Sequence, residues 1–349
     1  MKKYLCVILC VCLLPLYGCG EGRLKRFQAT DLTLFDTVSV ITGYARSKEE
    51  FDKMSDDLFS LLEKYSRLYD IYYTYDGVIN LHSINQSASE GAVEADGEII
   101  ALLGFAKEAA ALTDGKCNIA MGSVFSLWHE SRRKASDSPD TAVLPDPDAL
   151  RAAAEHTDIE DLIIDSDANT VRFADSGLLL DVGAVAKGYA AEMGARYAKQ
   201  KGYDNLLINL GGTVRSVGTK PDKTGWVLGI ENPSDTQKLI CEVSFSDMAL
   251  VTSGDYQRFF TVDGKDYHHI IDPDTLFPAE FFSSVSVICE DAGLGDVLST
   301  ALFNMTEGEG RSLISSLDKQ KYGSIGVMWV YSDGKISKGG DFSNYETVK

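Results

Sequence analysis

The centre of this chain reads Leu179-Leu180-Asp181-Val182-Gly183-Ala184-Val185-Ala186-Lys187-Gly188-Tyr189. Its apolar start is expected to form a strand, which enters a glycine-hinged turn and then a long helical pattern. On the amino-terminal side the patterns are mainly helical. Apolar residues recur at three- and four-residue steps after the capping signal Ser47-x-x-Glu50, and a second helix is expected over 97–112. Short strands dominate after the central segment, without repeated β-α-β units, and this order predicts an α+β fold in one compact domain.

The strands expected in the carboxyl-terminal half are short and rich in β-branched and aromatic residues. We place them at 206–210, 226–230, 240–245, 250–253, 259–262, 267–271 and 285–289, after an earlier pair at 162–165 and 171–174. Asp263-Gly264 is expected to be a tight hairpin turn. Helices near 294–305 and 309–317 precede a last pair of strands at 326–331 and 335–337. The stretch 131–147, rich in charge, Ser, Asp and Pro, is expected to be a surface excursion.

The amino terminus predicts export. Lys2 and Lys3 precede an apolar run at 4–16, which is too short to span a bilayer permanently and is typical of a secretory signal. The run ends in Leu16-Tyr17-Gly18-Cys19, which resembles the lipobox of bacterial lipoproteins; the alternative is an ordinary signal peptide with an incidental cysteine. We therefore expect a signal peptide at 1–18, lipidation of Cys19, a tether at 19–30 and a domain at 31–349. The protein would then lie on the extracytoplasmic face of the cell membrane (the periplasmic side in a Gram-negative cell), anchored by lipid only.

Charge and cysteine content narrow the class of protein. The formal net charge of −19 argues against a nucleic-acid or anionic-membrane surface, because such partners need clustered Lys and Arg. An acidic protein that binds an anionic ligand must neutralise it locally, with backbone amides, a few placed cations or a metal. Cys117, Cys241 and Cys289 lie among apolar neighbours without a Cys-x-x-Cys spacing, and we interpret them as small hydrophobic side chains rather than disulfides or ligands.

The sharpest chemical signal is Asp296-Val297-Leu298-Ser299-Thr300. Residues four apart lie one above the other on a helix, so the Asp296 carboxylate and the Thr300 hydroxyl face the same point. Both are hard oxygen donors of the kind that Mg²⁺ prefers, and one carboxylate with a few neutral oxygens leaves coordination positions for phosphates. On its own, such a pair is more often a solvated helix face.

The central segment gives this pair its context. A strand that runs through a glycine turn into a helix leaves N–H groups available to an anion, and Lys187 adds a positive charge in the first turn. A plain strand-to-helix connection with a solvated lysine is the alternative, since the segment is neither a Walker A loop nor a Gly-x-Gly-x-x-Gly fingerprint.

Further glycine-broken segments follow. Asn209-Leu210-Gly211-Gly212-Thr213-Val214-Arg215 carries paired glycines inside an apolar strand, which would permit close approach of a flat or phosphorylated ligand; a structural bulge explains it equally well. Thr252-Ser253-Gly254-Asp255-Tyr256, with Arg258, could line a nucleotide site or form a β-turn.

The histidines are unevenly distributed. Tyr267-His268-His269-Ile270-Ile271-Asp272-Pro273 holds two of the five, and histidine is suited to deprotonate a hydroxyl near neutral pH. Strand alternation puts the pair on opposite faces, so at most one reaches a substrate. The polar surroundings of His82, His129 and His156 indicate surface residues.

Taken in order, these segments resemble the ApbE family of FAD:protein FMN transferases. The family pattern has Leu-Asp-x-Gly-x-x-x-Lys-Gly-Tyr, Asn-x-Gly-Gly, Ser-Gly-Asp-Tyr, His-Ile-x-Asp-Pro and Ala-Asp-x-x-x-Thr-Ala, and the resemblance covers roughly residues 30–340. It implies a single ApbE-like domain, related to the T-fold, with mixed or antiparallel sheets and packed helices. It assigns His269 as the catalytic base, and Asp296 and Thr300 with the backbone carbonyl of Ala184 as metal ligands. The implied flavin-nucleotide pocket residues are Asp181, Lys187, Gly211, Gly212, Ser253, Asp255 and Tyr256.

The resemblance also implies a reaction. A threonine or serine hydroxyl of a target redox protein would attack FAD, AMP would leave, and FMN would stay attached, with Mg²⁺ (or Mn²⁺) required. Acceptors would be exported or membrane redox proteins, such as Rnf- or Nqr-type subunits or extracellular flavoprotein reductases. The alternatives are a Mg²⁺-dependent FAD pyrophosphatase that gives FMN and AMP, and a flavin-binding lipoprotein without catalysis. The chain departs from the family pattern at Gly295, at Thr213 and at Leu276-Phe277, none of them a proposed ligand.

Overall fold

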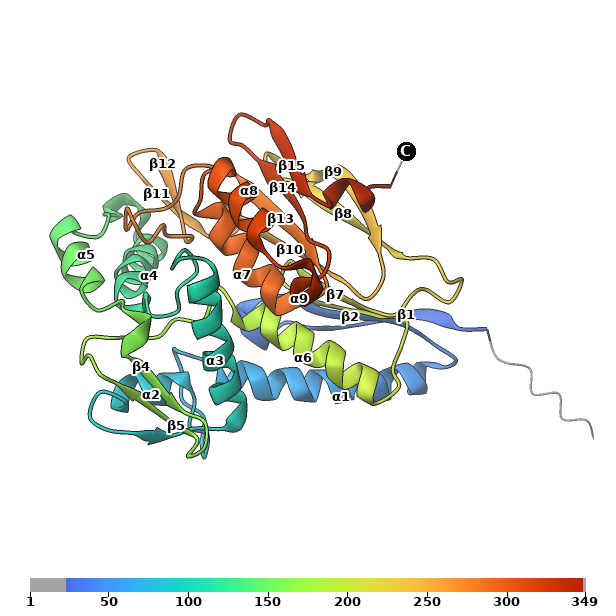
Figure 1. Ribbon diagram of the computed structural model, residues 1–349, viewed down its shortest axis with the longest axis horizontal. Helices are drawn as coiled ribbons and strands as arrows, with labels where there is room; N and C mark the ends of the chain where they lie inside the picture. Colours follow the sequence, from blue (N-terminus) through green and yellow to red (C-terminus); the bar gives the residue numbers. More distant parts are fainter. Residues whose placement is uncertain (1–22, 348–349) are drawn as a thin grey trace, which may run out of the picture.

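The computed structural model describes residues 23–347 and is shown in Figure 1. The expected signal peptide, Cys19 and the first part of the expected tether lie outside the described residues. The helices are α1 (Lys48–Leu68), α2 (Leu81–Ser87), α3 (Gly97–Leu112), α4 (Gly122–Asp137), α5 (Pro147–Ala154), α6 (Ala186–Gln200), α7 (Ala292–Phe303), α8 (Glu307–Ser316) and α9 (Lys319–Tyr322). The strands are β1 (Lys25–Asp31), β2 (Ser39–Ala45), β3 (Val93–Glu94), β4 (Leu162–Asp165), β5 (Thr170–Phe173), β6 (Leu206–Leu210), β7 (Thr213–Val217), β8 (Trp226–Asn232), β9 (Asp235–Phe245), β10 (Ala249–Gly254), β11 (Phe259–Val262), β12 (Lys265–His268), β13 (Ser284–Cys289), β14 (Gly326–Val330) and β15 (Ile336–Gly340).

An eight-stranded antiparallel sheet forms the centre of the fold, in the order β1-β2-β6-β7-β10-β13-β14-β15. Its central strands are apolar on both faces, and every residue of β13 and β14 is buried. A strand of this kind must be covered from both sides. Insertions between strands of this sheet build the rest of the molecule: α1 to α6 with the small sheet lie between β2 and β6, the β8–β9 hairpin between β7 and β10, and the β11–β12 hairpin between β10 and β13.

Different layers cover the two faces of the sheet. Helices α1, α6 and α7 pack on one face, where their apolar sides and those of the strands form the main core (Figure 1). The β8–β9 hairpin covers part of the other face and forms a second cluster around Phe245, Met328 and Phe342. Cys117 and Cys289 are buried as expected, while Cys241 is partly buried beside this second cluster.

A third apolar cluster lies at one end of the molecule. Helices α4 and α5 pack there against the β11–β12 hairpin, with Trp128 at the centre of the contacts. The Trp128 ring meets those of Phe260, Tyr267 and Phe277 at centroid distances of 6.2, 6.3 and 5.4 Å. A small sheet, β3-β5-β4, completes this side with α2 and α3 (Figure 1).

The α+β class, the antiparallel pairing and most expected elements are confirmed. Helix α3 has the expected bounds, and α1 begins after Ser47, whose side chain accepts a hydrogen bond from the N–H of Glu50. Only half of the expected capping box forms, because the Glu50 carboxylate accepts from the N–H of Arg46 instead. Asp263 and Gly264 have φ of 51° and 79°, as a tight hairpin turn requires.

Several expectations are wrong in their bounds. Residues 25–30, assigned to a tether, belong to β1, which pairs along its whole length with β2. The expected surface excursion starts too early, because α4 continues to Asp137. The strand expected at 267–271 ends at His268, where the chain turns and the Ile270 carbonyl accepts from the N–H of Ala279.

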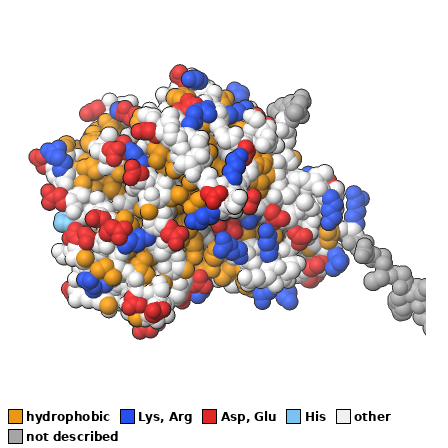
Figure 2. All heavy atoms as spheres, in the orientation of Figure 1, with side chains coloured by type: hydrophobic (Ala, Val, Ile, Leu, Met, Phe, Trp, Pro, Cys, Tyr) orange, Lys and Arg blue, Asp and Glu red, His pale blue; other side chains and the backbone are white. Residues whose placement is uncertain are grey.

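None of the helices between residues 23 and 347 combines the length and the apolar character that crossing a membrane would need. On the face drawn in Figure 2, Lys and Arg side chains alternate with Asp and Glu and do not gather into one continuous patch.

Candidate active site

A cavity of about 360 Å³ opens where the helical layer, the carboxyl end of β10 and the α4 region meet. Its volume lies in the range of small-molecule sites. The expected site residues on its wall are Asp181, Ala184, Lys187, Gly211, Ser253, His269, Asp296 and Thr300. The structure therefore brings together residues that are up to 119 positions apart in sequence, from Asp181 to Thr300.

The segment before α6 is not the expected strand. Leu179 forms only an isolated bridge to Met121, and Leu180 is held by a side chain rather than by a neighbouring strand. Asn85 of α2 donates from Nδ2 to the carbonyl of Leu180 at 2.9 Å and accepts from its N–H at 2.8 Å. This double contact replaces strand pairing and directs Asp181 into the cavity, where its Oδ1 accepts from the N–H of Gly183 at 2.9 Å.

Asp296 of α7 takes over the capping of α6. The N-cap position of α6, Val185, has no side-chain cap, and the N–H of Gly188 donates to Asp296 Oδ2 at 2.7 Å. In most helices a Ser, Thr, Asp or Asn just before the first turn accepts a hydrogen bond from one of its free N–H groups. In α6 the distant Asp296 has this role. Gly188 is required here because a Cβ would lie 2.3 Å from the carbonyl oxygen of Ala292 and 2.5 Å from the Cβ of Asp296. The two helices thus cross in backbone contact at the site.

Oxygens without a hydrogen-bond partner among the described residues line the cavity beside this crossing, and they are of the kind that a hard divalent cation prefers. Asp296 is 4% exposed, and burial raises its pKa even though Lys187, with Nζ 3.9 Å from Oδ2, lowers it. Within the described part of the chain, Asp296 Oδ1, the Thr300 hydroxyl and the Ala184 carbonyl enter no hydrogen bond. A cation at these oxygens would offset the cost of the buried carboxylate. Residues 23–347 hold no group of three or more His, Cys, Asp or Glu side chains that could bind a metal in another way.

The glycine pair lies in a turn. Gly211 and Gly212, with φ of 58° and 95°, form the two-residue connection between β6 and β7 rather than a break inside one strand. A Cβ on Gly211 would lie 2.1 Å from the Thr37 hydroxyl, so the strand end and the Thr37 loop meet closely at the cavity wall. Gly212 does not line the cavity, and its N–H donates to Asn209 Oδ1 at 3.2 Å.

Ser253 lies on the cavity wall and ties it to α7, because its hydroxyl donates to Ser299 Oγ at 2.9 Å. Asp255 and Tyr256 do not line the cavity. The N–H of Asp255 donates to the Ser283 carbonyl, and the Tyr256 ring folds back over Gly254. For Gly212, Asp255 and Tyr256 a direct role in ligand binding stays a prediction.

The two neighbouring histidines have different environments. His268 is a structural residue, with Nε2 2.8 Å from the Ala279 carbonyl and Nδ1 accepting from the N–H of Ile270. His269 faces the cavity, and its Nδ1 lies 3.3 Å from the Arg258 carbonyl. That contact places the proton on Nδ1 and leaves Nε2 as an acceptor. His269 is exposed to the open cavity, yet the protein around the ring displaces water and lowers its pKa, and the charges of Arg258 and Lys187 lower it further.

One cavity residue, His129, was assigned to the wrong environment, and others such as Tyr72, Lys116 and Arg132 were not predicted. His129, expected on the surface, lines the cavity with its Nε2 3.7 Å from Asp181 Oδ2 and its Nδ1 3.2 Å from the Tyr72 hydroxyl. Burial lowers the pKa of His129, and Asp181 partly opposes this effect. His129 was predicted to be a surface residue because its sequence neighbours are polar. The side chain that contacts it, Tyr72, comes from a loop that is distant in sequence.

Basic side chains line the cavity although the chain is acidic, and they lie beside the carboxylates of Asp36, Asp181 and Asp296. Lys187, Arg132 and Arg258 face the cavity, and burial lowers the pKa of Arg132. Lys116 also reaches the wall, but its Nζ is paired with Asp272 and Asp274 at 2.9 Å each. Lys187 is paired with Asp296. Arg132 and Arg258, in contrast, have no carboxylate partner among the described residues. Such cations attract and orient an anionic ligand.

A basic wall, a buried carboxylate with free oxygens beside it and a neutral histidine in one cavity define an α+β enzyme that acts on a phosphate-bearing ligand. The comparisons with known proteins agree with this class. The family model described as "ApbE family" matches residues 31–322, so the chain belongs to the ApbE family.

Curated relatives that match this chain over most of their length are FAD:protein FMN transferases. The FAD:protein FMN transferase of Klebsiella pneumoniae is 31% identical over 261 residues, which cover 74% of this chain and 78% of the relative. The FAD:protein FMN transferase of Treponema pallidum is 29% identical over 332 residues, which cover 91% of this chain and 88% of the relative. Among solved structures, the ApbE protein of Thermotoga maritima has a TM-score of 0.80 at 27% identity and covers 93% of this chain and 100% of its own.

Proposed function

We infer that the chain is an FAD:protein FMN transferase that attaches FMN to a threonine or serine hydroxyl of a redox protein and needs Mg²⁺, or Mn²⁺ in its place. In this reaction a bond forms between the hydroxyl oxygen and the FMN-side phosphorus of FAD. The bond from that phosphorus to the bridging oxygen breaks, AMP leaves, and the hydroxyl proton passes to a base. The observation that carries the proposal is that one cavity joins the free oxygens beside Asp296 to the basic wall and to His269.

Asp296, Thr300 and the Ala184 carbonyl would hold the cation, which would neutralise charge on the pyrophosphate when bound. Lys187 and Arg258 add positive charge on the wall where the phosphates would lie. Phosphoryl transfer asks for little covalent work by the protein, so alignment and charge compensation supply most of the acceleration. Since Gly188 and Asp296 are in direct contact, these groups are preorganised before the substrate arrives.

His269 serves as the base. Its Nδ1 donates to the Arg258 carbonyl, which leaves Nε2 to accept the proton of the attacking hydroxyl. Because its pKa lies below the ordinary value, the ring is neutral at neutral pH and ready to accept that proton. Bound FAD brings negative charge next to Arg258 and Lys187, and this charge raises the basicity of the ring when it is needed.

The deciding experiment incubates the protein with FAD, Mg²⁺ and an acceptor domain that carries an exposed threonine. Transfer adds the mass of FMN less water to the acceptor, whereas free FMN and AMP alone would identify a pyrophosphatase. If FAD stays intact with every acceptor and His269→Ala changes nothing, a flavin-binding protein is the better account.

We further propose that the protein is a lipoprotein anchored through Cys19 on the extracytoplasmic face of the membrane, and that its acceptors are exported or membrane redox proteins. An anchor would hold the enzyme where such acceptors emerge. Metabolic labelling with a clickable fatty acid tests this step: label in the unmodified chain and none in Cys19→Ala supports the anchor, and equal label in both contradicts it.

A further inference from the structure

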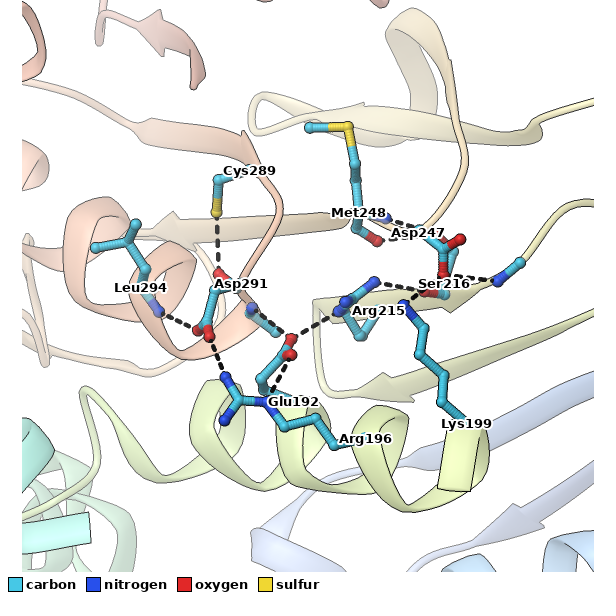
Figure 3. Close-up of polar contacts among 12 residues, drawn as sticks. Glu192, Arg196, Lys199, Arg215, Ser216, Asp247, Met248, Cys289, Asp291 and Leu294 are labelled. Carbon is cyan, nitrogen blue, oxygen red and sulfur yellow. Dashed lines mark hydrogen bonds and ion pairs between the residues drawn. The ribbon is translucent and has the colours of Figure 1, made fainter. Parts of the chain in front are cut away.

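A buried ion-pair network lies between α6, β7 and the start of α7 (Figure 3). Glu192 and Arg215 are 5% and 4% exposed, and Arg215 Nε donates to Glu192 Oε2 at 2.7 Å. Neither side chain lines the cavity. The cost of removing two charges from water largely cancels their attraction, so a buried pair is weak evidence for a stabilising role. The pair also fixes the position of a neighbouring helix, α7.

Glu192 contacts the first turn of α7 directly. Its Oε2 also accepts from the N–H of Ala292 at 3.2 Å, and its Oε1 accepts from Arg196 Nε at 3.1 Å. Arg196 continues to Asp291 Oδ2 at 2.9 Å, and Asp291 caps α7 by accepting from the N–H of Leu294 (Figure 3). Burial raises the pKa of Glu192, but Arg215, Ala292 and Arg196 together outweigh this effect and keep it below the ordinary value. The carboxylate is therefore charged.

The same two helices meet at the cation site, one turn away. Gly188 and Glu192 lie four residues apart on one face of α6, and Ala292 and Asp296 lie four apart on the facing side of α7. The contact from Gly188 N–H to Asp296 Oδ2 is 2.7 Å, and the contact from Ala292 N–H to Glu192 Oε2 is 3.2 Å. Because both contacts are short, α7 cannot slide along α6 without breaking the two together.

We propose that Glu192 is a positioning residue for the cation site: held by Arg215, it binds the first N–H of α7 and so fixes where Asp296 stands relative to Gly188 and Ala184. The inference rests on the proposed function, since that proposal makes Asp296 a cation ligand. Glu192 does not line the cavity, and its contact with the helix of Asp296 is the hydrogen bond to Ala292. Its removal thus changes cation affinity more than it changes the chemistry of bound FAD.

The test compares two double variants of the full chain in which no buried charge is left unpaired. Glu192→Leu with Arg215→Met removes the acceptor for Ala292, whereas Glu192→Gln with Arg215→Met keeps an amide oxygen in its place. Mn²⁺ binding without FAD is measured from the free-ion electron paramagnetic resonance signal. We expect the Mn²⁺ concentration for half-saturation to rise at least tenfold in the first variant and less than threefold in the second. Thermal melting is recorded for both, and Ala198→Gly, at a buried position farther along α6, shows what loss of helix stability alone does to Mn²⁺ binding.

Two outcomes overturn the proposal: half-saturation within twofold of the unmodified chain in the leucine variant, or equal losses in both variants. If the leucine variant does not fold, Ala292→Pro replaces it, because proline is tolerated at the first position of a helix and removes the donor. A tenfold loss there supports the proposal, and unchanged binding contradicts it. Failure of the unmodified chain to bind Mn²⁺ would instead refute the cation site of the proposed function, and this inference with it.

Discussion

Two parts of the cavity wall are built in different ways. At the crossing of α6 and α7, backbone meets backbone, and Asp296 is held by a 2.7 Å hydrogen bond inside the main core. On the α4 side, Tyr72 of the loop between α1 and α2 is 50% exposed, and its hydroxyl lies 3.2 Å from Nδ1 of His129. The crossing can hold reacting groups in fixed positions, whereas the α4 side can adjust to the shape of a ligand. Chemistry should therefore depend on the first region, and affinity on the second.

We expect the largest effect on activity from a change at Asp296. Asp296→Asn keeps an oxygen for the N–H of Gly188 but removes the negative charge that would hold the cation. We expect kcat for flavin transfer to fall on the order of 10²- to 10³-fold or more, since electrostatic groups of this kind contribute several kcal/mol. Flavin fluorescence of the acceptor after gel separation measures the rate, and circular dichroism checks the fold. A fall of less than fivefold would remove Asp296 from the chemistry.

His269 gives the next largest effect. A general base contributes about 10²- to 10⁴-fold, so His269→Asn should lower kcat within that range while FAD binding stays near its original strength. Because the pKa of the free enzyme's His269 lies below 6.5, kcat/KM should stay level as the pH falls to 6.5 and decline only below it. The decline in kcat should lie at higher pH, since bound FAD offsets the charges of Arg258 and Lys187. Identical pH profiles for the variant and the unmodified chain would contradict this role.

Gly188 tests whether the close crossing itself matters. Gly188→Ala forces a Cβ to within 2.3 Å of the Ala292 carbonyl oxygen, so α6 and α7 must separate. We expect a loss of about 1–3 kcal/mol in the free energy of unfolding, as overpacking usually costs, together with a roughly tenfold loss of activity. Gly308→Ala in α8 is the matched control, because nothing lies within 4 Å of its added Cβ. It should be neutral or up to about 1 kcal/mol more stable, with full activity. Equal behaviour of the two variants would show that the crossing tolerates separation.

The same contrast explains what could be predicted from sequence. Asp296 and Thr300 were found because i and i+4 positions share a helix face, and the turn at Asp263-Gly264 and the cap at Ser47 are also local signals. Such features need no knowledge of distant residues. The local sequence therefore predicted most of the elements and several residues that the structure brings to one cavity, and their catalytic roles stay predictions.

The failures all involve distant partners. Leu179–Asp181 resembled a strand, yet Asn85 and Met121 supply its contacts from far along the chain. The capping of α6 by Asp296 joins residues 108 positions apart, and no local pattern reveals it. His129 was placed on the surface for the same reason, and β1 was missed because residues 25–30 were themselves assigned to the tether.

Changes to the contact between His129 and Tyr72, on the α4 side of the cavity, should have the smallest effects on activity. Tyr72→Phe removes the hydroxyl that lies 3.2 Å from His129 Nδ1 but keeps the ring. An exposed hydrogen bond contributes about 0.5–1.5 kcal/mol, so KM for FAD should rise about two- to tenfold while kcat changes less than twofold. Tyr73→Phe, at a neighbouring position that is 67% exposed and lies off the wall of this cavity, is the control and should change neither constant. Should Tyr72→Phe lower kcat as strongly as KM rises, the α4 side would take part in the chemistry, and the division between a fixed crossing and an adaptable wall would fail.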